Sequence, residues 1–335
     1  MRKISGILVA SALVASIALV APAANATGEQ INGSGSSYMN SFQQTCSAAY
    51  TADVVTYASK GSGTGKTEFA NGTTSFGGSD SLYSSDAPSN FVYVPLVGGP
   101  IGIVYNIKGV KNLRLTPALL NGIFTGKIKN WNAAAIKAEN PAAALPAKAI
   151  QIVYRSGTSG TTNNFGNFMA QNVGGKWKAA DAWADASGST KGTGATNNAG
   201  MVTTVKGLAN SIGYADVADA KAAKLPFASL KNAMGQYVQP TASASSRFLA
   251  KQTISSSGEL IINHKSKISG GYPVVLVSYG LAPTKASNPT KAAAVKAYFT
   301  YLINTCGPKE AAKGGYVAIS GALKTKALAL IARIK

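Results

Sequence analysis

The feature that most constrains the fold is an apolar run that leads into a loop rich in glycine and hydroxyl residues. Residues 149–154 predict a buried strand, and residues 163–169 predict the first turns of a helix. Between them, Arg155 offers a fixed charge and a planar fork of donors. The helix start adds free backbone N–H groups and a partial positive charge. The stretch therefore predicts an anion cradle, although a single cluster of this kind is more often a simple turn.

Similar loops occur earlier in the chain. Residues 33–38 and 61–66 repeat the glycine and hydroxyl chemistry, each between an extended stretch and a helical one. Residues 75–81 add a carboxylate, Asp80. Strands that alternate with helices predict an α/β fold, in which ligands bind at the carboxyl ends of the strands. If the loops converge there, they form an oxyanion site with many donors and one acceptor.

The remaining chain gives weaker expectations. Residues 91–96 and 101–106 predict two apolar strands, separated by Gly98-Gly99-Pro100. Residues 240–270 are polar, and we expect them to be peripheral. Residues 188–200 are rich in Gly, Thr and Asn, which fits either a loop near the ligand or a flexible surface turn.

The charge balance favours an anionic partner. The 335 residues carry 32 basic and 12 acidic side chains, for a net charge of +20, and 46% are hydrophobic. A field of this sign attracts anionic small molecules, nucleic acid or an anionic envelope. The lysines are scattered and form no basic run interleaved with aromatic residues, so we expect no nucleic-acid binding. We expect a basic, solvated surface that can associate with an anionic cell envelope.

The N-terminus has the pattern of a signal peptide, residues 1–26. A charged start, an apolar stretch and Ala24-Asn25-Ala26 as a cleavage site predict a secreted chain that begins at Thr27, with a net charge of +18. The alternative is an uncleaved anchor helix. No cysteine lies near the cut, so we expect no lipid anchor. The two cysteines, Cys46 and Cys306, are either paired in a disulfide, which an oxidising compartment favours, or two buried free thiols.

Two enzymatic or nucleotide-binding interpretations are weaker. A nucleotide-binding P-loop would need glycine where Lys60 stands before the second loop. A secreted hydrolase would need a nucleophile elbow, Gly-x-Ser-x-Gly, or grouped metal ligands, and the chain has neither pattern and a single histidine, His264. A lone histidine is more often a surface or structural residue.

Taken together, the loops resemble those of the phosphate-binding proteins of bacterial phosphate ABC transporters. These proteins belong to the two-lobed periplasmic-binding-protein class, and the resemblance covers essentially the whole mature chain. Each segment alone is a weak marker, but their order and spacing are specific. The segments are residues 33–38, 61–66, 75–81, 126–131, 155–161, 211–214 and 272–279.

The resemblance implies a phosphate held between the lobes and almost fully dehydrated. Donors would come from backbone N–H groups, hydroxyls and one guanidinium, and Asp80 would accept a hydrogen bond from a protonated phosphate oxygen. That acceptor would reject sulfate, which has no proton to give. By position in the motifs, the phosphate-binding residues would be Ser37, Tyr38, Ser62, Asp80, Arg155, Ser159, Gly160 and Thr161.

The third loop departs from the family pattern at one position. The family usually has an aspartate two residues after the arginine, where it helps to orient the guanidinium. Here that position is Gly157. Arg155 is therefore expected to be held differently, which leaves affinity, the choice between phosphate and arsenate, and binding of a different oxyanion open.

The resemblance also implies the domains, the partners and the location. Residues 27–105 and 271–335 would form lobe I, residues 106–270 lobe II, and a hinge would join them. Both cysteines would then lie in one lobe, which supports a disulfide. The protein would be a secreted or periplasmic monomer without cofactor or catalysis, and its partners would be inorganic phosphate and the membrane subunits of an ABC permease. An envelope scaffold or adhesion protein with this fold remains the alternative.

Overall fold

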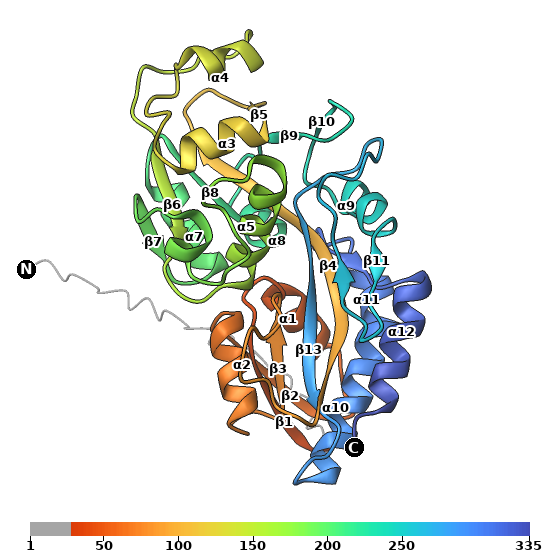
Figure 1. Cartoon of the computed structure of the whole chain (residues 1–335). Coiled ribbons are helices and arrows are strands. Elements are labelled where there is room, and N and C mark those ends of the chain that lie inside the picture. Colours follow the sequence, from red (N-terminus) through yellow and green to blue (C-terminus); the bar gives the residue numbers. More distant parts are fainter. Residues whose placement is uncertain (1–27) are drawn as a thin grey trace, which may run out of the picture.

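The structure is a computed structural model that describes residues 28–335, so the predicted signal peptide lies outside the described residues. The chain forms two lobes, one above the other in Figure 1, and the C-terminus lies in the lower lobe. In chain order the elements are β1 (Gln30–Gly35), α1 (Asn40–Ala48), β2 (Val54–Ser59), α2 (Ser62–Ala70), β3 (Phe76–Ser79), β4 (Phe91–Asn106), β5 (Arg114–Leu115), α3 (Pro117–Phe124), α4 (Ala134–Glu139), β6 (Gln151–Arg155), α5 (Gly160–Val173), α6 (Trp183–Ser187), β7 (Thr193–Ala195), α7 (Asn198–Gly207), β8 (Ser211–Asp216), α8 (Val217–Ala222), β9 (Ser229–Lys231), β10 (Tyr237–Val238), α9 (Ala242–Leu249), β11 (Thr253–Ile254), β12 (Leu260–Ile261), β13 (Val275–Pro283), α10 (Pro289–Tyr301), η1 (Leu302–Cys306), α11 (Gly307–Glu310), β14 (Val317–Ala318) and α12 (Gly321–Ala332).

A nine-stranded sheet connects the two lobes. Its order is β2-β1-β3-β13-β4-β8-β6-β7, and β14 pairs with β4. The parallel pairs lie toward the two ends of the sheet, where β1 pairs with β2 and β3, and β6 pairs with β7 and β8. The antiparallel strands β13 and β4 lie in the middle. The predicted two-lobed α/β fold with mixed sheets is confirmed.

Strand β4 is continuous, so the prediction of two strands broken by a Gly-Gly-Pro turn is wrong. Its 16 residues are almost all buried. Gly98, Gly99 and Pro100 stay in the sheet because they pair with residues 275–277 of β13. Beyond them, Ile101–Asn106 pairs with β8. One long strand thus passes from the lower lobe into the upper lobe, as Figure 1 shows.

Residues 240–270 are not wholly peripheral, which corrects a second expectation. Helix α9 has Thr241 as its N-cap, and it buries Ala244, Phe248 and Leu249 against the core. A Cβ placed on Gly98 would lie 2.8 Å from Leu249 Cδ1, so the helix lies directly on β4. The sequence misleads here because the apolar positions occupy only one face of a short helix that is otherwise polar.

The disulfide between Cys46 and Cys306 is present, with a Cα–Cα distance of 5.8 Å. Cys46 lies in α1 and Cys306 ends η1, so the bond joins segments 260 residues apart in sequence. The prediction of a bonded pair is confirmed, and the alternative of two free thiols is excluded. None of the helices within residues 28–335 has both the length and the apolar character that a membrane span requires.

Candidate functional site

The predicted site residues lie in loops that meet at the junction of the two lobes. The loops follow β1, β2, β3 and β6, and the loop after β6 leads into α5, whose N-cap Ser159 accepts a hydrogen bond from Thr162 N at 3.2 Å. The side chains at these positions are all at most 5% exposed. They are Ser37, Tyr38, Ser62, Asp80, Arg155, Ser159 and Thr161.

Gly160 brings the two lobes into direct contact. A Cβ placed on this first residue of α5 would lie 2.5 Å from Ser62 Oγ and 2.7 Å from Asp80 Cβ. No residue larger than glycine fits there without a shift of these neighbours. The start of α5, with its free N–H groups, therefore lies against Ser62 and Asp80.

Asp80 is a buried carboxylate whose two oxygens have different surroundings. Its Oδ1 accepts hydrogen bonds from the hydroxyls of Ser36 and of Ser278, the latter at 2.5 Å. Its Oδ2 has no hydrogen-bond partner among the contacts of the described residues, and it is left to meet a donor from elsewhere. Burial raises the pKa of Asp80 to about 6, although hydrogen bonds from Ser278 and Ser36 and the charge of Arg155 act in the opposite direction. When ionised, Asp80 can accept hydrogen bonds through Oδ2 but cannot donate one.

Arg155 is a buried cation whose guanidinium and backbone N–H make separate hydrogen bonds. Its side chain ends β6 and is 1% exposed. One terminal nitrogen donates to the carbonyl of Thr196 at 3.1 Å, and Arg155 N donates to the hydroxyl of Tyr214 at 3.2 Å. Its Nε is buried without a partner among the described residues. Burial lowers the pKa of Arg155, while the nearby Tyr214 and Asp80 oppose that shift.

Gly157 lies near the backbone carbonyl that accepts a hydrogen bond from the guanidinium of Arg155. The only heavy atom within 4 Å of a Cβ built on Gly157 is the carbonyl oxygen of Thr196, at 3.8 Å. The same carbonyl accepts the hydrogen bond from Arg155. A neutral backbone group of the segment before α7 therefore accepts a hydrogen bond from the guanidinium of Arg155.

Asn198 is a central polar residue that the sequence analysis did not identify. It is the fully buried first residue of α7. Its Nδ2 donates to Ser37 Oγ at 3.1 Å and to Thr161 Oγ1 at 3.4 Å, and its Oδ1 accepts from Asp216 N at 3.3 Å. The signal for it was the Asn197-Asn198 pair just before the apolar residues of α7, which is a helix N-cap pattern. Both expectations for residues 188–200 hold in part. Residues 188–192 are a largely exposed turn, and Asn198 reaches the site.

Two of the predicted site residues, Tyr38 and Ser62, also make hydrogen bonds within the protein. Tyr38 N donates to Ser36 Oγ at 3.1 Å, and the Tyr38 hydroxyl donates to the carbonyl of Pro100. Ser62 Oγ accepts a hydrogen bond from Asp80 N at 3.1 Å. Ser36, which the sequence analysis did not single out, thus connects Tyr38 with Asp80.

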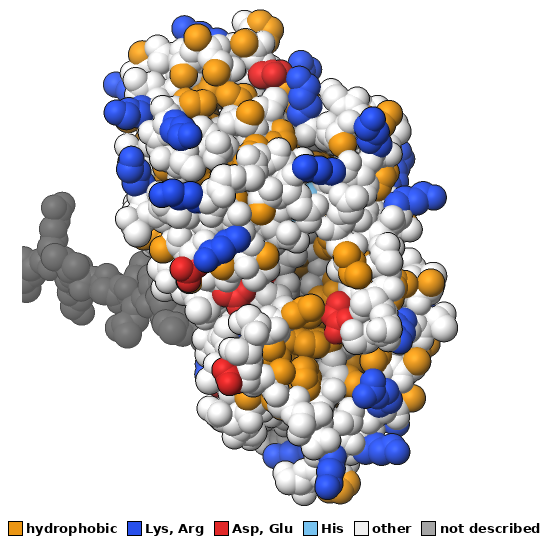
Figure 2. All heavy atoms as spheres, viewed as in Figure 1, with side chains coloured by type: hydrophobic (Ala, Val, Ile, Leu, Met, Phe, Trp, Pro, Cys, Tyr) orange, Lys and Arg blue, Asp and Glu red, His pale blue; other side chains and the backbone are white. Residues whose placement is uncertain are grey.

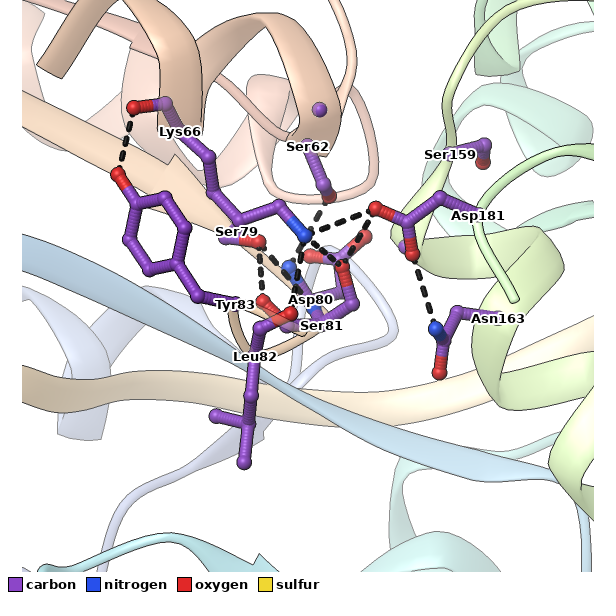
Figure 3. Close-up of polar contacts among 12 residues, drawn as sticks. Ser62, Lys66, Ser79, Asp80, Ser81, Leu82, Tyr83, Ser159, Asn163 and Asp181 are labelled. Atoms are coloured by element: carbon purple, nitrogen blue, oxygen red, sulfur yellow. Dashed lines mark hydrogen bonds and ion pairs between the residues drawn. The ribbon is translucent and has the colours of Figure 1, made fainter. Parts of the chain in front are cut away.

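Lys66, which lies in α2 within the segment that invited comparison with a P-loop, contacts the other lobe. Its Nζ lies 2.9 Å from Asp181 Oδ2 and also donates to Ser81 Oγ and to the carbonyl of Leu82 (Figure 3). A P-loop lysine points its charge at a bound phosphate, whereas this ammonium group is already paired with a carboxylate. This contact argues against the nucleotide-binding interpretation.

His264 is a core residue, which weakens the hydrolase interpretation. Its Nδ1 lies 2.8 Å from the carbonyl of Pro273, and its ring packs edge-on against Phe168. Burial lowers the pKa of His264 to about 4. No hydroxyl is hydrogen-bonded to its ring among residues 28–335, and the described residues contain no group of three or more His, Cys, Asp or Glu side chains that could hold a metal ion.

Comparisons with known proteins relate this chain to phosphate-binding proteins. A family model for the PBP superfamily domain matches residues 20–305. Phosphate-binding protein PstS 3 of Mycobacterium tuberculosis is 32% identical over 305 residues, which cover 86% of this chain and 80% of that protein. Phosphate-binding protein PstS of Xylella fastidiosa is 32% identical over 300 residues, which cover 87% of this chain and 81% of that protein.

Solved structures agree with the fold. A high-affinity periplasmic phosphate-binding protein (PfluDING), bound with phosphate, matches with a TM-score of 0.76 at 22% identity, and the match covers 90% of this chain and 93% of that one. A phosphate-binding protein from Stenotrophomonas maltophilia matches with a TM-score of 0.68 at 19% identity over 90% of this chain and 93% of that one. At these identities the likeness concerns the fold alone.

Proposed function

Because this chain belongs to the PBP superfamily and, within it, to the family of PstS phosphate-binding proteins, we propose that it captures inorganic phosphate between its lobes and delivers it to an ABC permease. The observation that carries the proposal is the meeting of Arg155, Asp80 and the start of α5 at one buried junction. A cation, a helix N-terminus and a single acceptor suit an oxyanion that carries a proton at neutral pH.

The proposed ligand contacts follow the predicted residues, with one adjustment. Ser37, Ser62, Ser159, Gly160 and Thr161 supply hydroxyl or N–H donors, Arg155 supplies the charged contact, and Asp80 accepts from the ligand. Tyr38 N is already engaged by Ser36. We therefore assign Tyr38 a smaller share of the binding than Ser37.

As a receptor, the protein binds phosphate without chemical change, as a monomer, outside the cytoplasm. The lobes divide at residues 105 and 271, and hinge motion about β4 opens the site. In Figure 2 the basic side chains are spread over the visible face, which suits electrostatic retention by an anionic envelope. Retention that persists in high salt would count against that part.

Calorimetric titration tests the function. Phosphate, arsenate and sulfate would be titrated into the mature chain, residues 27–335, after bound ligand has been stripped by partial unfolding. We expect tight phosphate binding without a sulfate signal, and loss of phosphate binding in Arg155→Ala. Asp80→Asn should bind sulfate, because its amide can donate where the carboxylate cannot. No heat with any of these anions would refute the proposal.

Two further measurements separate a phosphate receptor from the alternative functions. Thermal unfolding with and without phosphate should show stabilisation of a receptor, whereas an envelope scaffold would show none. Release of phosphate from a phosphomonoester, compared between the wild type and His264→Ala, tests for a hydrolase. We expect no release from either protein.

A further inference from the structure

The ion pair of Lys66 and Asp181 lies at the edge of the candidate site and joins the two lobes. Lys66 belongs to α2, and Asp181 belongs to the segment between α5 and α6 (Figure 3). Their side chains are 12% and 16% exposed. The other ion pairs of residues 28–335 each include a lysine that is at least 36% exposed. Within the described chain, this is the ion pair most shielded from water.

The pair is hydrogen-bonded to both sides of the candidate site. On one side, Lys66 Nζ donates to Ser81 Oγ at 3.1 Å, and Ser81 directly follows Asp80. On the other side, the backbone carbonyl of Asp181 accepts from Ser159 N at 2.9 Å. The Asp181 carboxylate also accepts from Ser81 Oγ at 3.0 Å and from Asn163 Nδ2 at 2.9 Å. The same few atoms therefore connect the segment that holds Asp80 with the cap of α5.

A cavity of about 960 Å³ adjoins the pair on its outer side. Lys66, Tyr83, Asn163 and Asp181 are among its lining residues, whereas Asp80 and Arg155 are not. The ion pair therefore lines this open cavity and, through Ser81 Oγ, is hydrogen-bonded to the segment that holds Asp80.

Building on the proposed phosphate-binding function, we propose that Lys66 and Asp181 form a latch that holds the lobes closed and sets the rate at which phosphate leaves. The physical reason is that the latch exists only when the lobes are in contact. It stabilises the closed state over the open state, and it acts on opening and release rather than on the encounter with the ligand. The two residues are positioning residues, because the contacts place them beside Asp80 and Ser159 and not on the ligand.

A double-mutant cycle on the full mature chain tests the latch. The variants are Lys66→Gln, Asp181→Asn and the double variant, and the readout is the release of radiolabelled phosphate into excess unlabelled phosphate, together with the association rate. We expect each single variant to raise the dissociation rate about tenfold and to change the association rate less than about twofold. The double variant should release phosphate no faster than the faster single variant, because the pair acts as a unit.

The pair of Lys60 and Glu68 provides the matched control. It also involves α2, has an N–O distance of 2.7 Å and lies within one lobe. Lys60→Gln and Glu68→Gln should leave the dissociation rate unchanged. Thermal unfolding of every variant identifies general destabilisation. Because the pair of Lys66 and Asp181 is largely shielded from water, salt screens it only weakly, and the test therefore rests on the variants.

The outcomes separate the latch from the function on which it rests. If the wild type binds phosphate and the single variants release it at the wild-type rate, the latch is refuted and the function stands. Additive effects in the cycle, or equal acceleration by the control pair, would refute it as well. If the wild type binds no phosphate, the proposed function fails, and the latch as stated here fails with it.

Discussion

Asp80 is the residue at which burial and selectivity oppose each other. A carboxylate that must accept from a ligand gains selectivity from a dry site, but the same dryness disfavours its charge. Two hydroxyl donors on Oδ1 compensate only in part, so the pKa is raised from 3.8 to about 6. The folded protein therefore holds this proton more tightly than the unfolded chain does.

The raised pKa predicts a pH-dependent effect of Asp80→Asn on stability. Above pH 6 the wild type bears the cost of a buried charge, and this cost disappears as the pH falls through 6 toward 4. We expect the variant to be more stable than the wild type by about 2–3 kcal/mol at pH 7.5, and equally stable near pH 4. Urea unfolding at both pH values, without added phosphate, measures the difference. A gain of equal size at both would contradict the assignment.

Asn198 is the residue that aligns two proposed ligand donors from different lobes. It contacts the hydroxyls of Ser37 and Thr161, and its carbonyl accepts from the backbone of Asp216. Truncation of its side chain removes this partner from Thr161 Oγ1 and from Asp216 N, whereas Ser37 Oγ still accepts from the backbone N–H of residue 198 at 3.2 Å.

Asn198→Ala should therefore raise the phosphate dissociation constant about tenfold. Asn198→Asp should raise it further, because it keeps the acceptor, loses the donors and adds a negative charge beside the anion site. Calorimetry on all three proteins gives the order of affinities, and thermal unfolding reports how much of the effect is structural. Wild-type affinity in Asn198→Ala would show that the hydroxyls need no such alignment.

At the scale of elements, α2 depends on glycine to lie close to the sheet. A Cβ on Gly65 would lie 2.4 Å from Gly35 Cα and 2.7 Å from the carbonyl oxygens of Gly78 and Ser34. These are backbone atoms of β1 and β3, which cannot move aside as the end of a side chain can. The glycines of the second loop thus serve packing as well as the anion cradle.

Gly65→Ala should destabilise the protein by about 1–3 kcal/mol, because the helix must move away from the sheet. Gly207→Ala is the matched control. Gly207 also lies in a helix, and no heavy atom lies within 4 Å of its added Cβ. We expect the control to be neutral or slightly stabilising. Denaturant unfolding of both variants gives the comparison, and equal effects would show that close packing of α2 is unimportant.

At the scale of the whole molecule, closure of the lobes depends on contacts that only small residues permit. Gly160 lies against Ser62 and Asp80 of the opposite lobe. Strand β4 is common to both lobes, because it pairs with β13 and with β8, and in the proposed function it is the hinge.

Gly160→Ala should therefore impair closure more than folding. We expect phosphate affinity to fall at least about tenfold, because an added Cβ forces the lobes apart in the bound state. The unfolding midpoint without ligand should change little. Small-angle X-ray scattering with and without phosphate measures closure, and a wild-type decrease in radius on binding would contradict this expectation.

The sequence by itself determined the local chemistry of this protein. The strands, the glycine and hydroxyl loops after them and the carboxylate of Asp80 are readable because turns and periodicity depend on neighbouring residues. The two cysteines and the arginine loop are likewise visible in the sequence. The order of these segments was enough to indicate the family.

Only the tertiary structure decided which distant groups meet. Asn198 and Ser37 are 161 residues apart, Lys66 and Asp181 are 115 apart, and Ser278 and Asp80 are 198 apart. No local pattern encodes such pairs, because they form only when packing brings distant segments of the chain together. The continuity of β4 has the same cause, since its Gly-Gly-Pro segment stays extended through pairing with β13. Local propensity alone predicts a break there, and the neighbouring strand overrides it.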